Sequence, residues 1–201
     1  MIQYLDRLPQ YIVCSGVTKR PIFNFIDRTI RPDHAVYVFA FSDDYSFGVM
    51  QANVHWTWFV TKCSKLAERF RYTPPTVYDT FPWPQSPTIP QVDAVAAAGR
   101  EVRRVRGEAL AKIKGGLRAV YRTLELPGKN PLKDAHAALD ASVLAAYGFD
   151  PRADLLAQLL ALNLSVAARE AAGLPVTAPG TPPGHPDPAR LVTDDCIRAD
   201  G

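Results

Sequence analysis

Residues 71–85 read RYTPPTVYDTFPWPQ, a stretch rich in proline and aromatic residues. Proline fixes φ and has no backbone N–H, so the four prolines between positions 82 and 90 exclude both a helix and a central strand there. Aromatic side chains of this size need a surface to pack on. We therefore expect residues 78–84 to form a stiff crossing that holds two structural units in one orientation, with a boundary near residue 85.

The chain before this crossing contains β-prone runs separated by turn residues. YIVC at 11–14, PIFNFI at 21–26 and AVYVFAF at 35–41 are rich in β-branched and aromatic residues, and they predict the strands of a small sheet. FRYT at 70–73 and TVYDTF at 76–81 predict further extended chain.

A helical pattern lies between these runs. Asp43 and Asp44 can cap a helix, and apolar residues then recur at helical spacing. The residues of this stripe are Phe47, Met50, Val54 and Trp58. The pattern predicts one or two helices from about residue 45 to residue 70, broken near Gly48.

The chain after the crossing is rich in alanine, leucine and arginine, and its periodicity predicts a bundle of roughly four helices. The expected helices lie near 91–114, 117–124, 132–147 and 150–172. Gly115 and Gly116 separate the first two, Gly148 ends the third, and Asp150 is the expected N-cap of the fourth. The leucines of the fourth helix need a partner surface. Six prolines after residue 174 predict an extended or disordered tail that docks at its end.

Composition excludes several classes of protein. The 201 residues are 47% hydrophobic and 21% charged, which is ordinary for a globular chain with one or two cores. No window approaches the roughly 18 apolar residues of a membrane span, and no signal peptide is visible, so we expect a soluble, cytoplasmic protein. Three widely spaced cysteines offer neither a disulfide framework nor a metal site. The net charge of +3 permits contact with nucleic acid without requiring it.

Four long segments together resemble the C-terminal part of MmeI-like (type IIL) DNA methyltransferases. They are YIVCSGVTKRPIFNFID at 11–27, VFAFSDDYSFGVMQANVHWTWF at 38–59, RFRYTPPTVYDTFPWPQ at 69–85 and LELPGKNPLKDAHAALDASVLAAYGF at 124–149. The family consists of large bacterial proteins that combine an endonuclease region, an adenine-N6 methyltransferase and a target recognition domain.

The resemblance implies an α+β chain with three parts. Residues 1–85 would be a partial, sheet-containing target recognition domain, residues 86–174 an all-α helical C-terminal domain, and residues 175–201 a Pro-rich tail. The implied function is DNA sequence recognition for a site-specific adenine-N6 DNA methyltransferase of a restriction-modification system. Its partner would be double-stranded DNA, and S-adenosylmethionine would be the cofactor of the complete enzyme.

Catalysis is not expected from this chain alone. Such methyltransferases hold the flipped adenine with a Pro-Pro-aromatic loop, whereas neither Pro74–Pro75 nor Pro182–Pro183 precedes an aromatic residue. Gly115 and Gly116 lie in a charged helical region, not after a strand as a cofactor loop would. Because Met1 falls inside the implied recognition domain, we expect a truncated or split methyltransferase. The alternative is a non-enzymatic DNA-binding or specificity-subunit-like remnant that pairs with a separate methyltransferase chain.

The resemblance places candidate base-reading residues before the Arg71–Tyr72 pair. They are Ala67, Glu68, Arg69 and Arg71. Arginine can bind guanine O6 and N7 in a bidentate manner, which suits this role. The alternative is a solvated helix end with a Glu68–Arg71 pair.

Other basic residues are candidates for contacts to DNA phosphates, which set register without reading sequence. These candidates are Lys19, Arg20, Arg28 and Arg31. Residues 100–122 hold eight basic and two acidic residues, which predicts either a solvated helix face or a DNA-backbone contact, the former favoured. His55 and the neighbouring tryptophans are expected to pack in the core, and His136 is expected to be structural.

Overall fold

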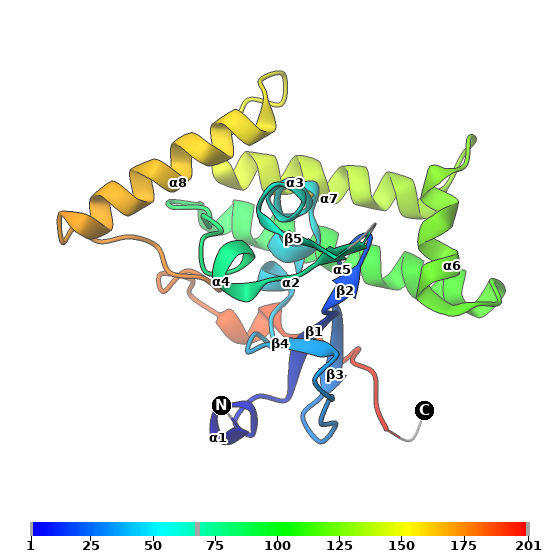
Figure 1. Ribbon diagram of the computed structural model, residues 1–201. Coiled ribbons are helices and arrows are strands. Elements are labelled where there is room, and N and C mark those ends of the chain that lie inside the picture. The colour runs from blue at the N-terminus through cyan, green and yellow to red at the C-terminus, as the bar shows by residue number, and fades with distance from the viewer. Residues whose placement is uncertain (1, 67–68, 200–201) are drawn as a thin grey trace.

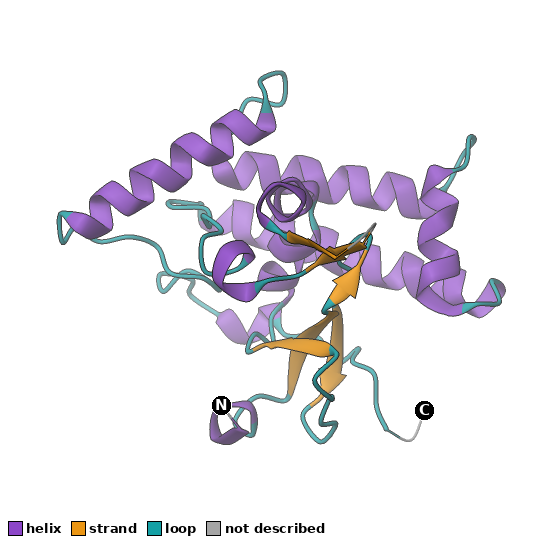
Figure 2. Ribbon diagram, in the orientation of Figure 1, coloured by secondary structure: helices purple, strands orange, loops and turns teal. Residues whose placement is uncertain are grey.

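The computed structural model describes residues 2–66 and 69–199, and within them it confirms the α+β fold class. A short helix, α1 (Ile2–Leu5), precedes the first sheet. This sheet has the order β3-β1-β4, formed by β1 (Gln10–Ser15), β3 (Asn24–Asp27) and β4 (Val36–Phe39). Both pairs are antiparallel, with Ile12 of the central strand opposite Phe25 and Phe39. The three β-prone runs therefore form the predicted strands (Figure 2).

A second sheet has the order β2-β6-β5 and was only partly expected. It contains β2 (Val17–Thr18), β5 (Ser64–Leu66) and β6 (Arg69–Arg71). The prediction of helix up to residue 70 is wrong because the helix ends at Lys62 and the chain pairs with β2 instead. TVYDTF is not extended either, since Pro74 begins a helical turn, α4 (Pro74–Val77).

The helical pattern of residues 44–62 forms two helices, α2 (Asp44–Gln51) and α3 (Asn53–Lys62). Asp43 caps α2 as expected, accepting a hydrogen bond from the Ser46 amide. The break lies at Ala52, whose ψ of 162° is extended, and not at Gly48. Gly48 serves close packing instead, because a Cβ there would lie 2.7 Å from Val95 Cγ1 on the next long helix.

The second half of the chain is helical, as predicted. It contains α5 (Ile89–Lys112), α6 (Gly116–Arg122), a 3-10 turn η1 (Thr123–Glu125), α7 (Pro131–Tyr147) and α8 (Leu155–Ala171). Helices α5 and α7 pack along one another, and α2 packs on α5 (Figure 1). Gly115, with φ of 109°, and Gly148, with φ of 68°, separate or end helices as expected. The N-cap of α8 is Asp154 and not Asp150, because Asp154 accepts the hydrogen bond from the Ala157 amide.

The crossing at residues 78–84 contacts several helices. Phe81 and Trp83 are buried, the Tyr147 hydroxyl of α7 donates to the Pro82 carbonyl at 2.8 Å, and Asn163 of α8 donates to the Thr80 carbonyl at 2.8 Å. One cluster of buried apolar residues runs through this region. Its first member along the chain is Ile12 and its last is Leu191. The crossing therefore packs into a continuous core.

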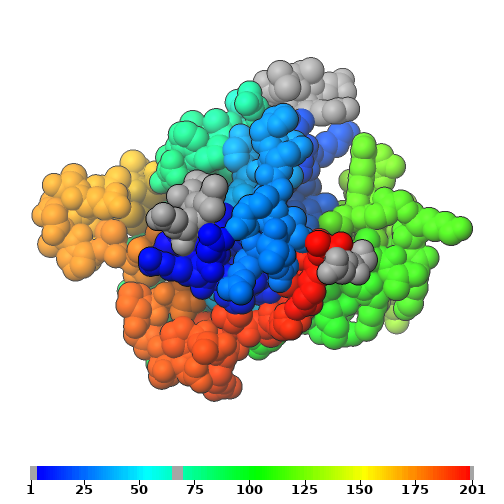
Figure 3. Space-filling view, turned by 90° about the horizontal axis from the view of Figure 1, so that it is seen from below, coloured from blue at the N-terminus to red at the C-terminus, as the bar shows by residue number. Residues whose placement is uncertain are grey.

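The C-terminal tail packs against the first sheet, which is formed by β1, β3 and β4. Its one regular segment in the described residues is a 3-10 turn, η2 (Pro188–Leu191), which buries Leu191. Further along, Ile197 exchanges backbone hydrogen bonds with Phe25 and Asp27 of β3, each at 2.9 Å. Figure 3 shows the red end of the tail between the blue N-terminal segment and the green helical segment.

No helix among residues 2–66 and 69–199 is long and apolar enough to cross a bilayer. Within the same residues, no cluster of three or more histidine, cysteine or acidic side chains is placed to hold a metal ion.

Candidate nucleic-acid interface

The hairpin of β5 and β6, here called the β5–β6 hairpin, has one anchored side and one exposed side. Phe70 packs edge-on against Phe59 at 5.8 Å and Trp56 at 6.4 Å between ring centroids, both on α3. Successive side chains of a strand point to opposite faces, and Arg71 is exposed. A two-stranded β-ribbon can enter the major groove of DNA, and β5 with β6 forms such a ribbon.

The candidate base-reading residues lie in or beside this hairpin. Ala67 and Glu68 fall outside the described residues. Arg69 begins β6, but its side chain is likewise outside the described part, whereas Arg71 is an exposed residue of β6 opposite Ser64 and Val17. The alternative of a helix end at these positions is wrong, because both flanking segments are strands.

Two of the candidate phosphate contacts lie near the hairpin. Val17 pairs with Arg71 and Thr18 with Phe70, so the chain leaves β2 beside β6 with Lys19 exposed. Arg20 differs, because it is half-buried and its Cζ lies 5.8 Å from the ring centroids of both Trp56 and Tyr121. Its guanidinium is therefore occupied in an intramolecular aromatic contact.

Arg28 and Arg31 lie elsewhere. They follow Asp27, which pairs with Gln10 at the start of β1, whereas β2 follows the end of β1. Arg31 forms an ion pair with Asp6 and Arg28 donates to the Asp6 carbonyl, all on the exposed surface. The structure does not bring these two residues together with Lys19.

The basic stretch at 100–122 is only in part the solvated helix face that its charge favours, and contact of its exposed part with the DNA backbone stays a prediction. Arg103 and Arg106 are buried: Arg103 binds Asp44 and Asp195, and Arg106 donates to the Phe23 carbonyl at 2.8 Å. Both guanidinium groups lie over the Phe47 ring. The reason is that α2 and the tail present carboxylates to this side of α5, and the segment before β3 presents the Phe23 carbonyl. The exposed basic residues of the stretch are Arg104, Lys112, Lys114, Arg118 and Arg122.

Two of the buried histidines, His55 and His136, are structural, as expected. His55 Nε2 lies 3.0 Å from the Tyr72 hydroxyl, and burial lowers the pKa of His55 to about 3. His136 Nε2 lies 3.3 Å from the Tyr121 hydroxyl, and burial together with the nearby Arg20 charge lowers its pKa to about 4. Both imidazoles are therefore neutral near pH 7.

Sequence reasoning missed the anchoring role of Phe70 and the intramolecular role of Arg20. The alternation Arg69-Phe70-Arg71 was the available signal for Phe70, since it places an apolar side chain opposite two basic ones on a strand. No local pattern pointed to Arg20, because its two ring partners lie 36 and 101 positions later in the chain.

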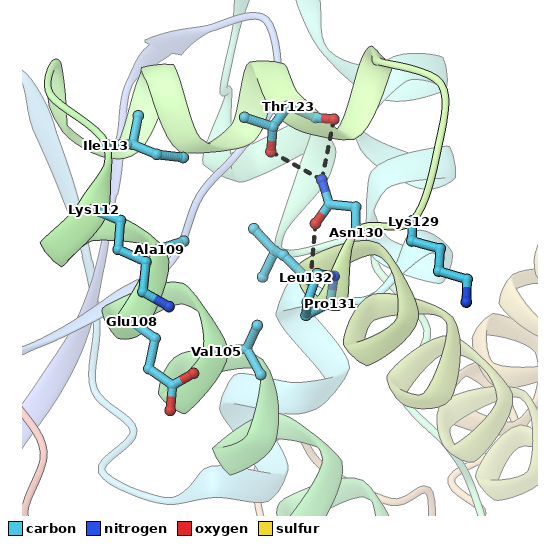
Figure 4. Close-up of a pocket in the computed structure, with 10 residues that line it drawn as sticks. All are labelled: Val105, Glu108, Ala109, Lys112, Ile113, Thr123, Lys129, Asn130, Pro131 and Leu132. Atoms are coloured by element: carbon cyan, nitrogen blue, oxygen red, sulfur yellow. Dashed lines mark hydrogen bonds between the residues drawn. The ribbon is translucent and has the colours of Figure 1, made fainter.

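A pocket of about 320 Å³ lies where α5, α6 and α7 meet, away from the hairpin (Figure 4). Its inner wall is aliphatic, with Val105, Ala109 and Leu132. The polar group at its centre, Asn130, caps α7 and donates to Thr123, so its hydrogen-bonding capacity serves the fold. Glu108, Lys112 and Lys129 also line the pocket, and the Glu108 carboxylate pairs with Arg104.

Comparison with known proteins connects this geometry to a family. Residues 20–85 match the family described as MmeI, target recognition domain, and this range includes the hairpin and the crossing. The chain is 30% identical over 112 residues to DNA methyltransferase A of Bacillus subtilis (strain 168), a match covering 56% of this chain and 12% of that protein.

A solved structure titled as the type IIL restriction-modification enzyme MmeI in complex with DNA has the same fold, with a TM-score of 0.70 at 24% identity. That match covers 79% of this chain and 21% of the other. This chain thus spans much less than two thirds of either relative. The resemblance seen in the sequence is confirmed by these matches.

Proposed function

We propose that this chain is the DNA-recognition portion of a site-specific adenine-N6 DNA methyltransferase of a restriction-modification system. The observation that carries the proposal is the coincidence of the family match at 20–85 with an exposed β5–β6 hairpin anchored by Phe70. We propose Arg71 and Arg69, with Ala67 and Glu68 between the strands, as the base-reading set. Lys19 beside the hairpin is the proposed phosphate contact, with Arg28 and Arg31 as proposed contacts farther along a duplex.

The proposal extends to the complete enzyme. Residues 1–85 act as part of a target recognition domain, residues 86–174 as a helical support and residues 175–201 as a docked tail. S-adenosylmethionine is the cofactor of the catalytic portion, which this chain does not supply. The site of action is the bacterial cytoplasm, where the DNA is.

Selection from a pool of random duplex DNA at several salt concentrations tests the function. We expect the purified chain to retain one short enriched motif, with affinity that falls as salt rises because phosphate contacts release counterions. A matched sample carrying Lys133→Gln, an exposed charge on α7, should retain the same motif. Retention without any enriched sequence, or no retention, would contradict a reading role for the isolated chain.

A second candidate is a specificity partner for a separate methyltransferase chain, and α8 favours it. Leu164 is 70% exposed, and Ala157, Ala161 and Ala168 are exposed at spacings of three and four residues on the same side of the helix. An apolar helix face of this kind suits contact with another protein surface. Leu164→Lys should abolish co-purification with a catalytic methyltransferase chain while leaving DNA retention unchanged; unchanged co-purification would count against this candidate.

A further inference from the structure

We propose that Arg20 is a positioning residue that braces the β5–β6 hairpin against the helical half, and that it does not contact DNA phosphate. The inference rests on the proposed function, which makes this hairpin the reading element. Arg20 was expected among the phosphate contacts because of its position beside Lys19. The structure separates the two neighbours, since Lys19 is exposed and Arg20 is half-buried between two aromatic rings.

The backbone around Arg20 is fixed by a local turn. The Arg20 amide donates to Thr18 Oγ1 at 3.2 Å, and the same hydroxyl donates to the Arg20 carbonyl at 2.6 Å. Thr18 itself pairs with Phe70 of β6. The start of the Arg20 side chain is therefore tied to the hairpin through one strand pairing.

The guanidinium then joins two helices, α3 and α6, and through Tyr121 it is linked to a third, α7. It lies 5.8 Å from the Trp56 ring of α3 and 5.8 Å from the Tyr121 ring of α6. Behind Tyr121, the His136 imidazole of α7 lies 3.3 Å from the tyrosine hydroxyl. A planar guanidinium can stack on two rings at once, which a lysine ammonium cannot reproduce.

Trp56 connects this brace to the reading side chains. The centroid of its ring lies 6.4 Å from the centroid of the Phe70 ring. The neighbours of Phe70 on the strand are the candidates Arg69 and Arg71. Bidentate recognition of a base edge tolerates little displacement of the side chain, so the platform under the hairpin must be rigid. Loss of the Arg20 contacts should therefore weaken the preference of the protein for one DNA sequence without removing a phosphate contact.

Amide hydrogen exchange, measured in the absence of DNA, tests whether Arg20 holds the β5–β6 hairpin in place. Arg20→Gln removes the stacked cation, Arg20→Lys keeps the charge but not the plane, and Lys133→Gln is the matched charge control. In both Arg20 variants the amides of β6 should exchange about three- to tenfold faster, while those of β1 and α5 keep their protection. Unchanged protection of β6, or an equal loss across all elements, would overturn the inference.

Binding to DNA then separates positioning from phosphate contact. In Arg20→Gln and Arg20→Lys the enriched motif should broaden while the salt dependence stays that of the unaltered chain, whereas Lys19→Gln should lower the salt slope by about 1. A lowered slope in Arg20→Gln that Arg20→Lys restores would identify a phosphate contact and overturn the inference. If the unaltered chain enriches no motif, the proposed function fails, and the exchange result alone decides whether Arg20 braces the hairpin.

Discussion

Arg103 of α5 and Asp44 of α2 form an ion pair at 2.5 Å between side chains that are only 4% and 0% exposed. The same guanidinium binds Asp195, so one buried arginine links α2, α5 and the tail. Removing Asp44 leaves the buried Arg103 guanidinium with the half-exposed Asp195 as its carboxylate partner.

We expect Asp44→Ala to lower the free energy of unfolding by about 3 to 5 kcal/mol, as is typical when one partner of a buried pair is removed. Urea denaturation of the variant measures this. The matched control is Glu101→Ala, which breaks the exposed Glu101–Arg104 pair and should cost no more than about 0.5 kcal/mol. Similar losses in the two variants would refute a stabilising role for the buried pair.

A prediction on DNA binding separates reading from phosphate contact. Arg71→Ala should weaken binding to the preferred site by about 1 to 3 kcal/mol and relax preference at one base position, because an arginine reading a base edge contributes only on the correct base. Arg69→Ala is expected to behave in the same way at another position. The measurement is affinity for the enriched duplex and for its single-base variants; equal losses on all sequences would argue against base reading.

Lys19→Ala should act differently from Arg71→Ala. Loss of a phosphate contact should weaken binding to every sequence alike and lower the salt slope by about 1. Titrations of one specific and one unrelated duplex across a range of salt concentrations would measure this. A change confined to the specific duplex would mean that Lys19 contributes to sequence preference.

Acid should destabilise the protein through two of its buried histidines, His55 and His136. The folded-state pKa values of His55 and His136 are lowered to about 3 and about 4, below the unfolded value near 6.5, so the unfolded state binds more protons between these limits. The stability that the two neutral histidines contribute is therefore present above pH 6.5 and is lost as the pH falls toward 4. From pH 7 to pH 5 each histidine should cost about 2 kcal/mol.

Urea denaturation of the unaltered chain, His55→Gln and the exposed-site control His34→Gln at pH 7 and pH 5 tests this linkage. The His55 variant should lose less stability on acidification than the other two proteins. Equal pH dependence in all three would show that His55 does not contribute to the linkage.

Two glycine substitutions test the packing of α2 on α5. One is at Gly48 of α2, where it faces α5, and the other is at Gly107 of α5. Gly48→Ala should destabilise by about 1 to 3 kcal/mol, because the added Cβ would meet Val95 at 2.7 Å and its carbonyl oxygen at 3.0 Å. Gly107→Ala, in an exposed turn of α5 with open space around it, should instead stabilise by about 0.5 to 1 kcal/mol. Thermal or urea unfolding of both variants measures the contrast, and the same sign of change in both would contradict it.

The sequence predicted those elements whose signals are local. Strand β1 and helix α7 follow from periodicity and from caps such as Gly148, which need no information from elsewhere in the chain. The β5–β6 hairpin was missed because residues 63–70 continue a helical pattern, and only pairing with the distant β2 makes the strand conformation favourable. The buried arginines were missed for the same reason, since Asp44 and Phe23 lie far from α5 in sequence. At the candidate site, the sequence pointed to the proposed reading segment but not to the contacts of Phe70 and Arg20 with distant residues.

The contact between Ile26 and Ile197 also orders events during synthesis. Residue 26 is synthesised long before residue 197, so the outer edge of β3 stays open while the 170 residues between them are made. Closing so long a loop is slow compared with forming local helices. The nascent chain therefore carries an unsatisfied strand edge until Ile197 has been made and has reached β3.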